Sequence, residues 1–174
     1  MLTVRRLVKI ESPWTTMPPV RLGKVPSGLG TADLFVTICD GELPLLRVDL
    51  YADSSSESAV FQDAIAWHDH VFVGFGHTVY VIDPKARLGF VVRLESYFAA
   101  FYSGEDYLLV ASADALLRMT AHGKVLWKTP NLGLDAVTIN HVGNGCVEGQ
   151  GEWDPPGGWR PFKLQLESGK LVAG

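Results

Sequence analysis

Cysteine is scarce in this chain, which has two among its 174 residues. Cys39 and Cys146 lie far apart in the sequence, so they form no CxxC pair of the kind that binds a metal or carries redox chemistry. A disulfide between them would require an oxidising compartment. A chain of this length buries enough apolar surface to fold without a cross-link. We therefore expect two buried thiols.

The chain also lacks an excess of basic charge and any long apolar run. Its formal net charge is −4 and its pI is about 5.7, whereas a nucleic-acid-binding face is normally basic. Arg5, Arg6 and Lys9 form a small basic group that we interpret as a solvated face. No apolar stretch reaches the roughly 18 residues of a membrane-spanning helix, and charges interrupt the N-terminus too early for a signal peptide. We expect a cytoplasmic protein with neither a nucleic-acid nor a membrane partner.

Motifs of the common catalytic and cofactor sites are missing. There is no GxSxG, HExxH, phosphate-binding loop or glycine-rich dinucleotide loop. Most aspartates fall at expected turns, where aspartate is an ordinary choice. His68 and His70 flank Asp69 at an expected hairpin tip, and His77 would lie roughly 20 Å away along an extended strand. We therefore assign no catalytic residue, metal or cofactor.

Short β-rich runs separated by turn signals occupy the chain after residue 32. The turns recur at intervals of about 8 to 14 residues, which is typical of a sandwich, barrel or propeller. No stretch has a sustained helical period. Residues 107–119 are rich in leucine and alanine, yet we interpret them as strands because they belong to a repeat. The serine-rich segment at residues 54–58 is interpreted as a solvated linker.

Two segments precede this region. Residues 2–10 alternate enough to form one strand. Residues 11–32 contain Pro13, Pro18, Pro19 and Pro26 together with several glycines, so they are predicted to be a loop. A loop of this length either carries function or wraps a surface.

Internal repeats decide the predicted architecture. The copies of one strand-and-turn pattern are residues 35–61, 71–94, 108–129 and 146–172. The strand-like runs that precede them are residues 64–67, 97–102 and 136–141, with residues 2–10 as the candidate for the first copy. Each unit then has four strands in about 36 residues, like a propeller blade.

The predicted fold class is therefore all-β, a small β-propeller-like repeat protein of about four blades in one domain over residues 1–174. Residues 2–10 offer two alternatives: the fourth strand of the first unit, or a strand that closes the ring by pairing with the last one. If the ring stays open, the stack would complete itself by forming a homodimer.

The segment from Gly123 to Thr129, GKVLWKT, resembles the repeat of the quinoprotein-like β-propellers, in which a Gly-Lys turn leads into a strand ending in Leu-Trp. The resemblance implies a propeller fold with Trp127 docked between adjacent blades. In the other copies this position holds Val91 or Val92, or is lost near Val172. It implies no quinone cofactor, because no metal-and-quinone site is found, and it fixes no function, because propellers host many.

The most unusual local sequence surrounds two tryptophans near the C-terminus. They flank a Pro-Pro-Gly-Gly turn with acidic and basic neighbours, and exposed aromatics beside polar groups are typical of binding surfaces. The predicted ligand- or partner-binding residues are Glu152, Trp153, Asp154, Trp159 and Arg160. The structural alternative is that the two tryptophans pack against each other across a hairpin.

Our leading hypothesis is a non-catalytic module that binds a protein or a small molecule with one propeller face. One alternative is a glycoside hydrolase with a carboxylate pair from Glu148, Glu152 and Asp154. A regular strand would put the two glutamates on one face, although Gly149 and Gly151 mark a bulge or a close backbone approach there. Another alternative is a structural subunit that assembles through open sheet edges.

Overall fold

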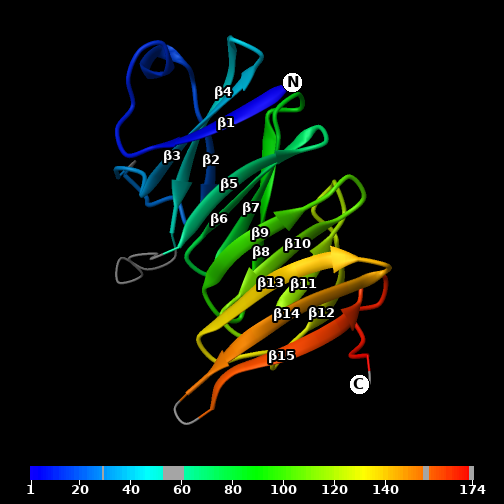
Figure 1. Cartoon of the computed structure of the whole chain (residues 1–174). Coiled ribbons are helices and arrows are strands. Elements are labelled where there is room, and N and C mark those ends of the chain that lie inside the picture. Colours follow the sequence, from blue (N-terminus) through cyan, green and yellow to red (C-terminus); the bar gives the residue numbers. More distant parts are fainter. Residues whose placement is uncertain (29, 53–60, 155–156, 173–174) are drawn as a thin grey trace. The chain divides into compact units, whose positions relative to one another are not determined.

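The computed structural model describes residues 1–28, 30–52, 61–154 and 157–172, which form an all-β fold (Figure 1). These residues contain 15 strands in four sheets and one short 3-10 segment, η1 (Trp14–Thr16). The predicted fold class, a small propeller-like repeat protein, is confirmed. The serine-rich linker expected at residues 54–58 lies outside the described residues.

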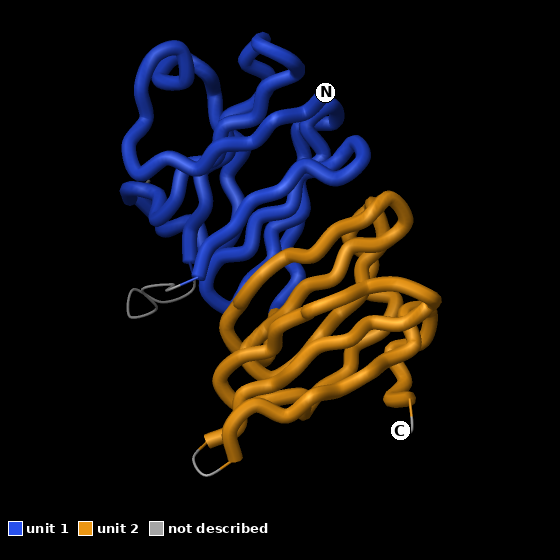
Figure 2. The backbone as a smooth tube through the Cα atoms, in the orientation of Figure 1, with its two compact units in different colours: residues 1–93 blue, residues 94–174 orange. Residues whose placement is uncertain are grey.

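Two compact units make up the chain, residues 1–93 and residues 94–174 (Figure 2). Each unit contains two of the four sheets. The single domain expected over residues 1–174 stays a prediction. No helical segment in the described ranges is long and apolar enough to cross a membrane.

The first sheet combines an N-terminal strand with strands of the first repeat copy. Its order is β1-β3-β4-β2, and the bounds are β1 Leu2–Leu7, β3 Leu34–Asp40, β4 Leu43–Tyr51 and β2 Val20–Gly23. β1 pairs antiparallel with β3. Residues 2–10 thus supply the extra strand of the first unit, as predicted. The alternative, a strand that pairs with the last repeat and closes a ring, is wrong.

The fourth strand of this sheet lies where the sequence predicts a loop. β2 belongs to residues 11–32 and runs parallel to β4, with Val20 opposite Val48. An edge strand forms hydrogen bonds along one side only, so it tolerates prolines nearby that would disrupt a central strand. β2 occupies the outer position of this sheet, beside β4. The first predicted copy, residues 35–61, would place its last strand there, close to residue 61. Residues 53–60 lie outside the described ranges.

Regular four-stranded meanders form the second and third sheets. The second sheet consists of β5 Gln62–Trp67, β6 His70–Phe75, β7 Thr78–Asp83 and β8 Leu88–Arg93. The third consists of β9 Phe98–Ser103, β10 Leu108–Ser112, β11 Leu116–Met119 and β12 Val125–Thr129. The stretch at residues 107–119 therefore forms strands, as predicted.

The last sheet has three strands, in the order β13-β14-β15. Their bounds are β13 Ala136–Gly143, β14 Cys146–Trp153 and β15 Gly158–Gln165. Within the described residues, the fourth strand expected for this copy is reduced to a single bridge between Leu171 and Leu164. No described residue pairs with the outer edge of β15 beyond that bridge.

Alternation along the strands buries one face of the first sheet against the second sheet. The first sheet contributes every other residue of β3 and β4, namely Leu34, Val36, Ile38, Leu46, Val48 and Leu50. Val71 and Val73 of β6 join the same apolar cluster. The hydroxyl of Tyr80 on β7 donates to the backbone oxygen of Tyr51 at 3.1 Å, and burial raises the pKa of Tyr80 to about 12.

The opposite face of the first sheet is covered by the chain's own segment before β2. On this face, Arg47 forms a two-pronged ion pair with Asp49, with N···O distances of 2.8 and 2.9 Å. Nη1 of Arg47 donates to the backbone oxygen of Trp14 at 3.3 Å, and Nη2 of Arg87 donates to that of Pro18 at 3.2 Å. This segment therefore wraps a surface, which is one of the two roles expected for it.

Trp127 joins the third sheet to the last one, as the resemblance implies. Its indole N–H donates to the backbone oxygen of Leu166 at 2.9 Å, and Nη1 of Arg118 donates to the same oxygen at 3.1 Å. The ring lies against Gly169, where a Cβ would come within 2.6 Å of it. Thr129 Oγ1 also donates to Gly169 at 2.6 Å. These contacts fix the turn after β15 to β11 and β12 of the third sheet.

The glycines of β14 mark close backbone approaches, which is one of the two expected explanations. A Cβ at Gly151 would lie 1.7 Å from the backbone oxygen of Leu132, and one at Gly149 would lie 2.3 Å from that of Thr138. β14 pairs with β15 without a register shift. The bulge lies instead in β13, at residues 139–141.

We expect Gly151→Ala to lower the free energy of unfolding by about 1–3 kcal/mol, because the added methyl forces the main chain at Leu132 to move. Urea unfolding monitored by tryptophan fluorescence measures the change. Gly28→Ala is the control, since a Cβ there meets no atom within 4 Å, and it should shift stability by no more than about 0.5 kcal/mol. Equal stability of the two variants would contradict the close approach.

Trp127→Phe should lower the free energy of unfolding by about 1–2 kcal/mol, because it removes the hydrogen bond to Leu166 while keeping most of the ring. Thermal unfolding followed by circular dichroism checks this. Trp159→Phe is the matched control, because Trp159 is 46% exposed. A loss at position 127 no larger than that of the control would show that the docking contact contributes nothing.

Candidate binding face on the last sheet

The hairpin of β14 and β15 carries all five residues predicted to bind a ligand or partner. Glu152 and Trp159 lie directly opposite each other in the ladder. Trp153 ends β14, Asp154 begins the turn, and Arg160 follows Trp159 in β15. The structure therefore brings these residues together at one end of the last sheet.

The register places the two tryptophans on opposite faces of that sheet. Directly opposed residues share a face, so Trp159 lies on the face of Glu152, while Trp153 lies on the other face with Arg160. The Arg160 guanidinium is 5.0 Å from the centroid of the Trp153 ring, which is a cation–π contact. The alternative in which the tryptophans pack against each other is wrong. Residues 155–156 of the turn lie outside the described ranges.

One face of the last sheet, called the exposed face below, carries a large aromatic among polar side chains. Its members are Thr138, Glu148, Gln150, Glu152, Trp159 and Lys163. Trp159 keeps 46% of its accessible surface. The opposite face contributes Val147 and Leu164 to the apolar core of the unit. Polar-outward alternation explains most of the exposed face, and Trp159, together with Pro161 opposite Gln150, departs from it.

An ion pair lies on the exposed face. The Lys163 Nζ and Glu148 Oε1 atoms are 2.7 Å apart. The hydrogen bond from Lys163, together with its positive charge, lowers the pKa of Glu148, and Glu148 in turn raises the pKa of Lys163. A glycosidase acid needs a carboxyl group with a raised pKa. Glu148 is therefore unsuited to donate a proton.

Strand geometry also bears on which acids could form the carboxylate pair of a glycoside hydrolase. Glu148 and Glu152 share one face, as expected for a regular strand, but they are four positions apart. Their Cα atoms are therefore about 13 Å apart. Glycosidases have their two carboxyl groups about 5–9.5 Å apart. The two glutamate side chains would have to lean toward each other to reach that range, whereas the Glu148 carboxylate is held by Lys163. Glu152 and Asp154 are the acids that still fit that alternative, which stays a prediction.

Two exposed leucines beside this face were not identified from the sequence. Leu134 is 48% exposed, and its N–H donates to the backbone oxygen of Glu152 at 2.7 Å. Leu171 is 66% exposed and lines an open depression with Pro161 and Lys163. Each is an isolated leucine just outside a strand, where only the fold reveals that its side chain stays exposed.

The outer edge of β15 is poorly suited to pair with another strand. The N–H of Gln165 points to this edge, because it donates to Lys170 at 2.8 Å. Alternation places the nitrogen of Pro161 on the same edge, and proline has no N–H to donate. Proline at an edge hinders pairing between sheets. This edge therefore gives little support to a structural subunit that assembles through open edges, and assembly at other edges stays a prediction.

Other candidate groups lie in ordinary structural settings. His68 has a φ of 52° in the turn between β5 and β6, and the carboxylate of Asp69 pairs with Lys85 at 3.0 Å. Cys39 and Cys146 are free thiols and half-buried, so the expectation that both are buried is wrong. Among the residues that the structure describes, no group of three or more histidine, cysteine or acidic side chains could hold a metal.

Comparison with known proteins identifies the fold. No protein-family model and no curated sequence matches the chain. BamB from Moraxella catarrhalis superimposes with a TM-score of 0.54 at 12% identity, over 83% of this chain and 44% of BamB. A protein of unknown function from Bacteroides caccae has a TM-score of 0.50 at 14% identity, over 80% of this chain and 61% of that protein.

The chain thus spans less than two thirds of either neighbour. BamB is a propeller of quinoprotein-like repeats, so the fold-level resemblance inferred from the Trp127 segment is confirmed. At these identities the likeness shows the fold alone, because one fold hosts many functions.

Lys163→Gln should raise the pKa of Glu148 toward its ordinary value, because the hydrogen bond and charge that lower it are lost. The pair stabilises the fold above the unfolded-state pKa of glutamate, and this contribution disappears as the pH falls through the lowered pKa. A side-chain carboxyl NMR titration measures the shift. Lys170→Gln should leave the pKa of Glu148 unchanged, and an equal effect of both variants would show that the ion pair is not specific.

Proposed function

We propose that this chain is a non-catalytic protein-binding module that holds its partner against the exposed face of the last sheet. The observation that carries the proposal is Trp159, a tryptophan that is 46% exposed on a regular strand position opposite Glu152. Tryptophan is enriched among the residues that dominate protein interfaces. A solvated sheet face with no partner would normally have a polar residue there.

Apolar and polar groups are distributed on this face as they are in a protein interface. Leu134 and Trp159 lie near one end of the hairpin, and Pro161 lies beside the Glu148–Lys163 pair. Interfaces combine apolar anchors with a polar surround. The eight residues of β15 extend over about 23 Å, which suits a macromolecular partner.

The shape of the face favours a protein over a small molecule. Small-molecule sites are concave and enclose most of the ligand, whereas the depression lined by Glu148, Pro161 and Lys163 is wide open. Trp153 and Trp159 point to opposite sides, so they cannot sandwich a sugar between them. Both observations support a protein partner.

The test uses the whole chain as immobilised bait in an extract of its source cells, with Trp159→Ala as the variant. A protein retained by the wild type is then purified, and its Kd is measured for each variant by calorimetry. We expect Trp159→Ala to weaken binding about 30-fold or more, because a buried tryptophan anchor contributes about 2 kcal/mol or more.

Leu126→Ala is the matched control, because Leu126 is also exposed, at 50%, but lies on β12, in another sheet. This variant should bind the partner as tightly as the wild type does. Thermal unfolding confirms that both variants stay folded. If the captured protein binds the Trp159→Ala variant as tightly as the wild type, or if no captured protein distinguishes the two, the proposal is wrong.

A further inference from the structure

A groove in the first unit lies between the free edges of two strands. It has a volume of about 500 Å³ and runs along residues 4–7 of β1, the adjoining Val8, and residues 62–64 of β5. Leu34 of β3 adds to its apolar wall. The groove is independent of the exposed face of the last sheet, since all of its residues belong to residues 1–93.

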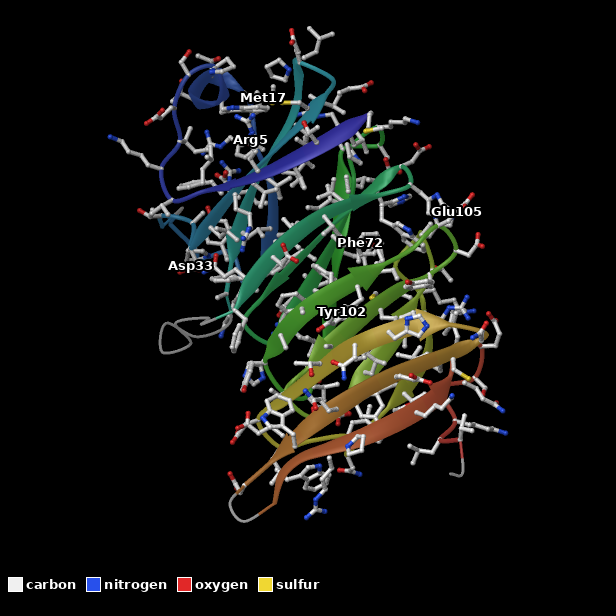
Figure 3. All side chains as sticks on the ribbon, in the orientation of Figure 1. Arg5, Met17, Asp33, Phe72, Tyr102 and Glu105 are labelled. Carbon is white, nitrogen blue, oxygen red and sulfur yellow. The ribbon has the colours of Figure 1, made fainter. Side chains whose placement is uncertain are left out.

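Two arginines of β1 line this groove, and both are exposed. Neither Arg5, marked in Figure 3, nor Arg6 forms an ion pair with a described residue. By contrast, Arg47 and Arg118 are each paired with a carboxylate. Among the described residues that line the groove, Asp63 is the single acid, and its Oδ1 atom accepts the N–H of Ala64 at 2.7 Å. The groove is locally basic in a chain whose net charge is −4.

The backbone of β1 also faces the groove with unpaired groups. Gly41 donates to the oxygen of Met1 at 3.1 Å, so the odd-numbered residues of β1 hydrogen-bond with β3. The N–H and C=O groups of Val4 and Arg6 therefore point to the free edge. On the other wall, Asp63 already occupies the edge N–H of Ala64. The free edge of β1 is thus the one that can accept a further strand.

From these observations we infer that the groove binds an extended, acidic segment of a partner protein. Main-chain hydrogen bonds to Val4 and Arg6 would align the segment along β1, as in strand addition. Arg5 and Arg6 are neighbours in β1 and point to opposite faces of the sheet, so carboxylates on the two faces of the segment would pair with one guanidinium group each. Its apolar residues would contact Leu34 and the other apolar residues of the groove. The unpaired positive charges specify an acidic segment rather than a neutral one.

Fluorescence polarisation of a short fluorescein-labelled peptide of the repeat Glu-Glu-Val-Val, which carries glutamate on both faces when extended, tests the inference on the full chain. We expect Arg5→Gln combined with Arg6→Gln to weaken binding roughly three- to thirty-fold, as for two exposed ion pairs. Added salt should weaken binding to the wild type more than binding to the double variant.

Arg21→Gln is the matched control, because Arg21 is an exposed arginine on β2 of the same sheet and outside the groove. It should bind the peptide as the wild type does, and circular dichroism shows whether each variant is folded. The same peptide with glutamine in place of glutamate should bind more weakly.

Three results would overturn the inference: no saturable binding by the wild type, equal binding by the double variant, or equal binding of the glutamine peptide. The inference would also be overturned if inorganic phosphate or a single-stranded oligonucleotide displaced the labelled peptide at a lower concentration than the unlabelled peptide does. That result would assign the groove to another kind of anion. None of these results bears on Trp159, so this inference and the proposed function fail independently.

Discussion

Each sheet of this protein has two faces, and folding within a unit depends on burying one of them against the neighbouring sheet. A lone sheet of this kind cannot cover its own apolar face. In both units a side chain of one sheet also holds a main-chain oxygen of the next. Tyr80 donates to Tyr51, and Trp127 donates to Leu166. Stacking therefore combines apolar burial with hydrogen bonds from the side chains of one sheet to the main chain of the next.

The surfaces available for binding are those that stacking does not use. On the first sheet, the far face is covered by the segment that Arg47 holds at Trp14. That sheet keeps the free edge of β1, where Arg5 and Arg6 form no ion pair with a described residue. On the last sheet, the far face stays exposed, and Trp159 interrupts its polar alternation. The two proposed binding surfaces thus differ in kind, one a strand edge and the other a sheet face.

Most strands could be predicted because their signals are local. Alternation and turn residues within a few positions located the second and third sheets, and the repeat corrected the helix-like composition of residues 107–119. β2 could not be predicted, because the prolines on both sides of it suggest a loop and its partner, β4, is more than twenty residues away. The missing strand of the last sheet has a similar cause, since Leu171 forms a bridge but no ladder.

By itself the sequence determined the fold class, the repeats and the segment that holds the candidate binding residues, and the resemblance of one strand to quinoprotein-like repeats implied the docking role of Trp127. These features follow from short-range periodicity and from one strand motif. Only the tertiary structure decided that Trp153 and Trp159 point to opposite faces, because a one-residue change of hairpin register reverses the face of every side chain. It also placed Arg5 and Arg6 beside the edge of β5, a neighbour that stacking of the sheets selects and that no local pattern encodes.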